Sequence, residues 1–250
     1  TLNKKVELPP YTYDEATNTY TVNTAEGLAV WADAARANLS TNCILGADIT
    51  LEVPDDGSDN WTPVGGNGSP YTGSFDGAGH TISNLKFNTS ENIKGMFGYI
   101  NGGARISNLE LKNVDINCTN SLPYTDIGAI AGWAEDATIV NCTVSGKIIA
   151  SSGNYVGGII GEGGSATRIY GCQVIDAEIS GNTTIGGVAG SNEGVIVACT
   201  VSSKISAGQW IAGGITGPNS GTITACCFSG NLSISMWSNK IGGIASSNSR

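Results

Sequence analysis

A glycine motif that recurs at a nearly fixed spacing constrains the fold of this sequence more than any other feature. Segments of the form Gly-Gly-apolar-x-Gly begin at Gly157, Gly186 and Gly213, and weaker copies begin at Gly128 and Gly242. Successive copies are 29, 29, 27 and 29 residues apart. A unit of this size cannot bury its own apolar face, whereas stacked units can. A period in this range therefore indicates a solenoid.

A second motif, Ile-x-x-Cys-x-Val or a close variant, recurs in the same frame. Its apolar residues fall at alternate or near-alternate positions, which is strand periodicity. A third short strand is expected after it, ending at an apolar residue such as Ile148 or Ile179. The sequence therefore predicts an all-β fold, a right-handed parallel β-helix with three short strands per coil.

The cysteines fit the repeat better than they fit a set of disulfides. One position of the second motif holds Cys or Leu in its six copies: Leu85, Leu109, Cys142, Cys172, Cys199 and Cys226. A position that accepts either residue is an inward apolar position, where free Cys packs as a small hydrophobe. Side chains stacked in register point the same way, which is poor disulfide geometry. We therefore expect a ladder of reduced cysteines, with Cys226 and Cys227 on opposite sides of their strand.

A row of polar residues immediately precedes the last apolar residue of the third predicted strand. Its charged members alternate in sign: Asp115, Lys147, Glu178 and Lys204, followed by Asn231. Stacked coils make these residues cross-strand neighbours, and exposed pairs of opposite charge contribute about 0.2–1 kcal/mol each. The alternation predicts a structural role in fixing the register and not acid–base chemistry.

The N-terminal region, residues 1–60, lacks the repeat. Apolar residues at helical spacing, among them Trp31, predict an amphipathic helix at residues 25–38. Asn23 or Thr24 can serve as its N-cap. Because the ends of a solenoid core need a cover, we expect this helix to cap the first coil.

Three segments at the start of the repeat region carry a family resemblance. They are Trp61-Thr62-Pro63-Val64-Gly65, Phe75-Asp76-Gly77-Ala78-Gly79-His80-Thr81-Ile82-Ser83-Asn84-Leu85 and Gly95-Met96-Phe97-Gly98. With the later glycine and cysteine motifs, they resemble GLUG-motif repeat proteins. The resemblance implies a right-handed β-helix of bacterial cell-surface and adhesin-like proteins, which are exported and often lipid-anchored. It also implies a structural motif without catalytic residues.

These observations predict two regions. Residues 1–60 form an N-terminal cap, and residues 61–250 form GLUG-type parallel β-helix repeats. We expect the repeats to continue into a C-terminal cap or a further domain.

Composition excludes several kinds of partner and site. The chain has 12 Lys and Arg against 21 Asp and Glu, a formal net charge of −9, whereas sequence-neutral nucleic-acid binding needs a positive surface. No apolar run approaches the roughly 18 residues that a membrane span requires. No CxxC occurs and His80 is the only histidine, so no zinc site of ordinary spacing is expected. We predict no metal and no cofactor.

The candidate binding residues are aromatic. They lie where the chain enters the glycine strand in four later repeats: Tyr124, Tyr155, Trp210 and Trp237. Aromatic side chains along one edge can contact sugar rings or a protein partner. The competing interpretation is that they only cover a corner of the core.

An enzymatic interpretation needs carboxylates that converge, since glycoside hydrolysis uses two carboxyl groups about 5–9.5 Å apart. The best candidates for a catalytic or metal-binding row follow the glycine strands: Glu135, Asp136, Glu162 and Glu193. A solvated edge is the structural alternative. His80 and Asp76 can form part of a triad or hydrogen-bond a turn, and the acidic turn 55–60 can bind Ca²⁺ or simply be solvated.

We therefore predict a non-enzymatic, adhesin-like protein of the bacterial cell surface. Its rigid β-helix would present a side face or loops to a glycan or to a host or matrix protein. The alternative is a polysaccharide-active β-helix enzyme, a lyase or a glycoside hydrolase. A stalk without any ligand is a third interpretation.

Overall fold

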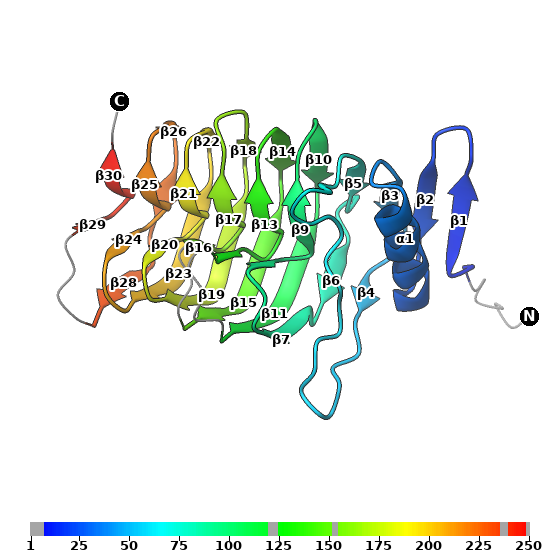
Figure 1. Cartoon of the computed structure of the whole chain (residues 1–250), viewed down its shortest axis with the longest axis horizontal. Helices are drawn as coiled ribbons and strands as arrows, with labels where there is room; N and C mark the ends of the chain where they lie inside the picture. The colour runs from blue at the N-terminus through cyan, green and yellow to red at the C-terminus, as the bar shows by residue number, and fades with distance from the viewer. Residues whose placement is uncertain (1–7, 120–124, 152–154, 236–239, 249–250) are drawn as a thin grey trace, which may run out of the picture.

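The computed structural model describes residues 8–119, 125–151, 155–235 and 240–248, and its strands stack into one elongated solenoid (Figure 1). Apart from the antiparallel β1–β2 hairpin, the paired strands of the described chain run parallel, each against the equivalent strand of a neighbouring coil. The predicted fold class, an all-β parallel β-helix with an N-terminal region that contains an α-helix, is confirmed.

Four sheets run along the solenoid, numbered here in the order in which the chain meets them within a coil. Sheet 1 contains β1 (Tyr11–Asp14), β2 (Thr19–Val22), β3 (Asn42–Leu45), β5 (Ser74–Asp76), β10 (Ala104–Ser107), β14 (Ala137–Val140), β18 (Arg168–Tyr170), β22 (Val195–Val197) and β26 (Thr222–Thr224). Sheet 2 contains β4 (Ile49–Thr50), β6 (Thr81–Ser83), β7 (Lys86–Thr89), β11 (Glu110–Cys118), β15 (Thr143–Ala150), β19 (Gln173–Gly181), β23 (Thr200–Ala207), β27 (Cys227–Phe228) and β28 (Asn231–Ile234). Sheet 3 contains β8 (Ile93–Lys94), β12 (Asp126–Ile127), β16 (Tyr155–Gly157), β20 (Thr184–Gly186), β24 (Ile211–Gly213) and β29 (Lys240–Gly242). Sheet 4 contains β9 (Phe97–Ile100), β13 (Ala131–Ala134), β17 (Ile160–Gly163), β21 (Ala189–Asn192), β25 (Thr216–Asn219) and β30 (Ala245–Asn248).

The coils have four sides, one more than the three strands per coil that the sequence predicts. The glycine motif is predicted as a single strand, but the chain turns a corner inside it: β16 ends at Gly157 and β17 begins at Ile160. A Cβ atom at Gly157 would lie 2.1 Å from the Ile160 carbonyl oxygen, so no side chain fits there. The motif is therefore a glycine-dependent corner between sheets 3 and 4.

A second corner lies just before the Cys or Leu of the other motif. The residue before that position has a left-handed backbone, with φ between 51° and 66° in its six copies: Asn84, Asn108, Asn141, Gly171, Ala198 and Ala225. Glycine and asparagine adopt this conformation more readily than alanine does. This residue turns the chain from sheet 1 into sheet 2.

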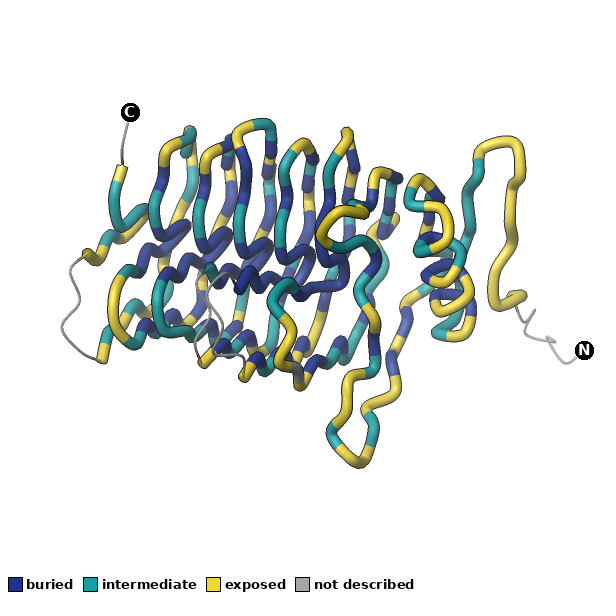
Figure 2. The backbone as a smooth tube through the Cα atoms, in the orientation of Figure 1, coloured by how far each residue is buried: buried dark blue, intermediate teal, exposed yellow. Residues whose placement is uncertain are grey.

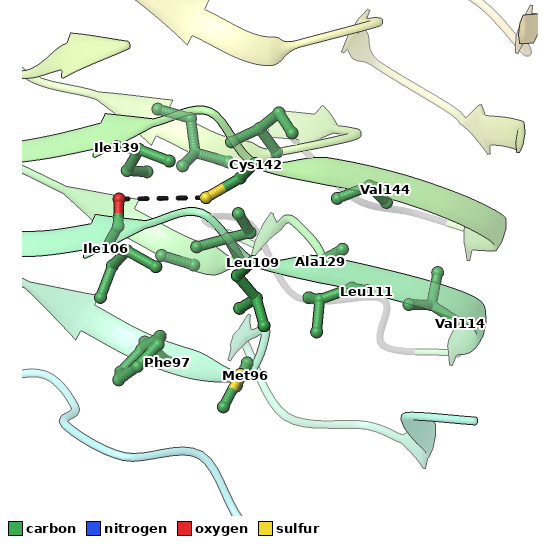
Figure 3. Packing of buried hydrophobic residues seen from close by; sticks show 14 of the residues in the cluster. Met96, Phe97, Ile106, Leu109, Leu111, Val114, Ala129, Ile139, Cys142 and Val144 are labelled. Atoms are coloured by element: carbon green, nitrogen blue, oxygen red, sulfur yellow. Dashed lines mark hydrogen bonds between the residues drawn. The ribbon is translucent and has the colours of Figure 1, made fainter. Parts of the chain in front are cut away.

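The predicted ladder of reduced cysteines is confirmed. Its members are buried except for the last, which is half-buried: Leu85, Leu109, Cys142, Cys172, Cys199 and Cys226. The Cys142 thiol donates to the Ile106 carbonyl of the preceding coil over 3.9 Å (Figure 3). Contact with the thiols above and below, together with burial, raises the pKa of Cys172, so that this thiol stays protonated. Cys227 is exposed, as expected for the opposite side of the strand.

The predicted charge row also stacks in register along sheet 2. Asp115 lies beside Lys147, Lys147 beside Glu178, and Glu178 beside Lys204. The row begins one coil earlier than predicted, because Lys86 pairs with Asp115 and forms an ion pair with it. The Lys204 Nζ lies 2.9 Å from the Glu178 Oε1.

The N-terminal helix α1 (Ala25–Ala37) packs on the first coil. Its N-cap is Thr24, whose Oγ1 accepts a hydrogen bond from the backbone N–H of Gly27 over 3.2 Å. The Trp31 side chain is fully buried, and its ring centroid lies 4.9 Å from that of Phe75. The helix therefore covers apolar surface at this end of the solenoid.

Burial changes along the solenoid (Figure 2). The core is continuous from α1 through successive coils. By contrast, the strands of the last described coil, β26 to β30, contain no fully buried residue. Inside sheet 4, the amides of Asn192, Asn219 and Asn248 form a stacked ladder, with Nδ2 to Oδ1 distances of 2.6 Å at both steps. The sequence motifs did not predict this ladder.

Candidate ligand-binding groove

The glycine corner places two columns of outward side chains beside one another, one on sheet 3 and one on sheet 4. The sheet 3 column contains Ile93, Asp126, Tyr155, Thr184 and Ile211. The sheet 4 column contains Tyr99, Trp133, Glu162 and Ser191. Figure 1 shows β16, β20 and β24 next to β17, β21 and β25 along the length of the solenoid.

The third glycine of each motif allows the two sheets to approach closely. A Cβ atom at Gly161 would lie 2.5 Å from the Ile127 nitrogen and 2.7 Å from the Asp126 carbonyl carbon. A real side chain cannot occupy such a position without moving one of the strands. The residue that follows this glycine in the sequence, Glu162, is therefore held beside the sheet 3 backbone.

A cavity of about 950 Å³ opens at the N-terminal part of this corner. Its floor includes Asp126, Trp133 and Glu162. The segments 59–67 and 91–94 supply the other walls, although one residue in the first segment, Val64, does not line it. We call this space the groove.

Asp126 is the most unusual residue of the groove. It is 7% exposed, and its Oδ1 has no hydrogen-bond partner. Burial, reinforced by the negative charge of Glu162, raises the pKa of Asp126 to about 7. A buried carboxylate without a compensating partner costs stability, so this position calls for an explanation beyond packing.

Glu162 is the second carboxyl group of the groove. Partial burial, followed by the charges of Glu193 and Glu135, raises its pKa. In register, Glu162 lies between Trp133 and Ser191, and neither can neutralise it.

The cation that lines the groove is already paired with acidic residues. Lys94 is buried, with its Nζ 3.0 Å from Glu91 Oε2 and 4.0 Å from Asp59 Oδ2. The Nζ also lies 5.2 Å from the ring centroid of Phe87. The positive charge of Lys94 is therefore committed within the protein.

Trp133 gives the groove a flat apolar surface. Its ring stacks on that of Tyr99, with the centroids 4.3 Å apart and the planes 11° from parallel. The Tyr99 hydroxyl accepts a hydrogen bond from Asn101 Nδ2 over 2.8 Å, which holds the Tyr99 ring in place. A ring held in this way can stack on a sugar or contact a cation.

Two of the four predicted aromatic residues, Tyr155 and Trp210, lie within the described part of the chain. Tyr155 follows Asp126 in the sheet 3 column. Trp210 lies one position before that column, beside Ile211, and is 51% exposed. Tyr124 and Trp237 lie outside the described residues.

The predicted acidic row is divided. Glu162 lines the groove, whereas Glu135 and Glu193 follow β13 and β21 and contribute charge near it. Asp136 is exposed beyond the groove lining. Within the described residues, no group of three or more His, Cys, Asp or Glu side chains is arranged to hold a metal ion.

The two remaining polar candidates have structural contacts. His80 Nδ1 lies 3.1 Å from Asp48 Oδ1, while Asp76 accepts hydrogen bonds from the Ala78 N–H and from Asn108. The triad interpretation of His80 and Asp76 is therefore wrong, because their side chains have different partners. In the acidic turn, Asp59 accepts a hydrogen bond from the backbone N–H of Asn88 over 2.6 Å.

Comparison with known proteins agrees with the repeat motifs. Residues 124–149 match the model of the GLUG motif family. One coil of the solenoid therefore carries a GLUG motif. The match covers β12, the glycine corner, β13 and the following Ile-x-x-Cys motif, and it includes the groove residues Asp126 and Trp133.

Two known proteins resemble this chain. Halomucin of Haloquadratum walsbyi is 31% identical over 121 residues, which are 47% of this chain and 1% of halomucin. A crystal structure from Bacteroides ovatus, described as a "putative immunoglobulin A1 protease", is 24% identical with a TM-score of 0.73, covering 91% of this chain and 70% of that one. The second likeness shows the fold alone. Motif and solenoid together fit a β-helix protein of the cell-surface type, and no helix in the described residues has the length and apolarity to cross a bilayer.

Motif alignment carried a signal for the groove residues that the sequence analysis missed. Asp126 stands two positions before the first glycine of its motif, where Tyr155 stands one repeat later. Trp133 directly follows the last glycine of its motif, at the position of Glu162. Alignment of the motifs therefore places these four residues in two columns, and the structure shows that the two columns meet at one corner.

Proposed function

We propose that this protein is a non-enzymatic, adhesin-like scaffold of the cell surface that binds a glycan in the groove. The observation that carries the proposal is the groove floor, where the stacked Trp133 ring lies with two carboxyl groups that no cation among the described residues neutralises. Sugar-binding sites combine a flat aromatic surface with convergent polar groups that accept hydrogen bonds from hydroxyls.

The rigidity of the solenoid supports this function. Parallel strands fix the backbone on both sides of the corner, so the groove is formed before a ligand arrives. An elongated ligand can follow the two columns past Tyr155 toward Trp210, which remains half exposed. The GLUG motif and the solenoid support a surface location for such a binding module.

A glycan array followed by calorimetry with the best ligand tests the proposal. We expect Trp133→Ala to weaken binding about tenfold, since contact with an aromatic ring contributes about 0.5–1.5 kcal/mol beyond the burial of its area and about 1.4 kcal/mol is tenfold in affinity. Tyr170→Ala is the matched control, because Tyr170 lies on sheet 1, outside the groove lining. Unchanged affinity in Trp133→Ala, with a folded protein by circular dichroism, would refute binding in the groove.

Polysaccharide cleavage is the second candidate function, and one observation favours it. Asp126, with a pKa near neutrality, lines the same cavity as Glu162, so one can be protonated while the other is ionised. Such a pair can supply a general acid and a base. Release of reducing ends from a polysaccharide panel, abolished in both Asp126→Asn and Glu162→Gln, would establish this activity in place of simple binding.

A further inference from the structure

The charges of the groove narrow the class of glycan that it can accept. The acidic residues that line it are Asp59, Glu91, Asp126 and Glu162, and its basic residue is Lys94. Lys94 is paired with Glu91 and Asp59, which leaves the charges of Asp126 and Glu162 uncompensated. An anionic polysaccharide would meet repulsion here, because like charges in a partly desolvated site cost binding free energy.

The surroundings of Asp126 indicate which chemical group of a ligand could pair with its carboxyl group. Its register neighbours are Ile93 and Tyr155. The charge of Glu162 from β17 acts on it, and Lys94 from β8 lines the same cavity. Glu135 and Glu193 add negative charge behind Glu162. A compact cation at this point would restore charge balance to a carboxyl group that is more than nine-tenths buried.

A protonated amine fits these surroundings better than a metal ion does. Ca²⁺ takes six to eight oxygen ligands, and the described residues contain no group of three or more side chains arranged for a metal. An ammonium group needs fewer contacts, and it can donate to both carboxyl groups while it lies over an aromatic ring. Trp133 supplies that ring.

We propose that the groove recognises a glycan whose sugars carry free, protonated amino groups, with one ammonium group bound between Asp126 and Glu162 over the face of the Trp133 ring. This inference rests on the proposed glycan-binding function and adds the class of sugar. An N-acetylated glycan of the same length lacks the cation and leaves the Asp126 carboxyl unpaired.

Calorimetry with two matched oligosaccharides tests the inference, one of β-linked glucosamine and one of β-linked N-acetylglucosamine, at about pH 6, where amines are protonated. We expect the glucosamine oligomer to bind at least tenfold more tightly. In Asp126→Asn this preference should fall below about threefold, because the amide carries no charge. Asp136→Asn, the same substitution at an exposed residue of the same coil, should leave the preference unchanged.

Proton release provides a second readout. Ammonium binding stabilises the ionised form of Asp126, so the wild-type protein should release a proton on binding the glucosamine oligomer at about pH 6. Titrations in buffers with different ionisation enthalpies measure this proton, and Asp126→Asn should not release it.

The outcomes separate this inference from the proposed function. Equal binding of the two oligomers, reduced by Trp133→Ala, would overturn the amino-sugar inference and leave glycan binding intact. No binding of either oligomer and no hit on the glycan array would overturn both. Binding of oligolysine without binding of the glucosamine oligomer would also overturn the inference, since the ammonium group would then belong to a peptide.

Discussion

Carboxylates occupy two contrasting settings on this solenoid. On sheet 2, Asp115 lies between Lys86 and Lys147, and Glu178 lies between Lys147 and Lys204. In the groove, the register neighbours of Asp126 and Glu162 are aromatic, apolar or hydroxyl-bearing residues: Ile93, Tyr155, Trp133 and Ser191. A stacked repeat can neutralise each charge simply by alternating the sign from coil to coil. The groove carboxyl groups have no such neighbours of opposite charge, and buried charge without a partner is typical of functional sites.

The largest expected effect concerns the pH dependence of stability. The pKa of Asp126 is raised from 3.8 to about 7 in the folded protein. The folded state therefore binds the proton more tightly than the unfolded state does. The resulting stabilisation is fully present below about pH 4 and is lost as the pH rises through about 7. We expect the free energy of unfolding contributed by this group to fall by about 4 kcal/mol over that range.

Urea unfolding of Asp126→Asn measures this contribution. The variant should be more stable than wild type at about pH 8, because an amide in the same place avoids a buried charge. Its stability should also vary less between about pH 5 and pH 8. Asp136→Asn serves as the control, and identical pH profiles for wild type and Asp126→Asn would show that Asp126 is not desolvated as described.

A charge reversal in the middle of the sheet 2 row should have an intermediate effect. Lys147→Glu replaces two favourable neighbours with two like charges, next to Asp115 and Glu178. We expect a loss of about 1–2 kcal/mol in the free energy of unfolding at low salt, and a smaller loss at high salt. Lys112→Glu changes the net charge equally at a position beside Ser83 and should cost less. If both variants lose the same stability, pairing in the row has no measurable value.

The smallest effect is expected at the exposed end of the same row. A hydrogen bond and ion pair with Lys204 lowers the pKa of Glu178, so its stabilisation is present above the unfolded pKa and is lost as the pH falls. This direction is opposite to that of Asp126. Lys204→Ala should cost about 0.5 kcal/mol at neutral pH. NMR titration should show the Glu178 carboxyl moving toward its ordinary pKa in the variant, and an unchanged titration would mean that the pair does not form in solution.

Sequence periodicity predicted the neighbours within each column because a parallel register repeats the same contact at every coil. The cysteine ladder and the row from Asp115 to Lys204 follow directly from that rule. The α1 helix could also be predicted, since its apolar spacing and its Thr24 cap are local signals.

The groove could not be predicted by the same rule. Asp126 and Glu162 belong to different columns, and what brings them together is the angle that the chain takes at the glycine corner. That angle depends on backbone contacts such as those of Gly161 with Ile127, which leave no periodic signal of their own. The same corner explains why four strands per coil replace the predicted three.

The glycine corner has a consequence for how such molecules can diversify. Each coil adds one residue to the sheet 3 column and one to the sheet 4 column, and it contacts only its immediate neighbours. Duplicating or deleting one unit of about 29 residues would therefore lengthen or shorten the two columns by one residue each. The packing of the core in the other coils would stay the same. If the proposed glycan binding holds, the number of units would set the length of glycan contacted, while the groove residues Asp126, Trp133 and Glu162 would set which sugars bind.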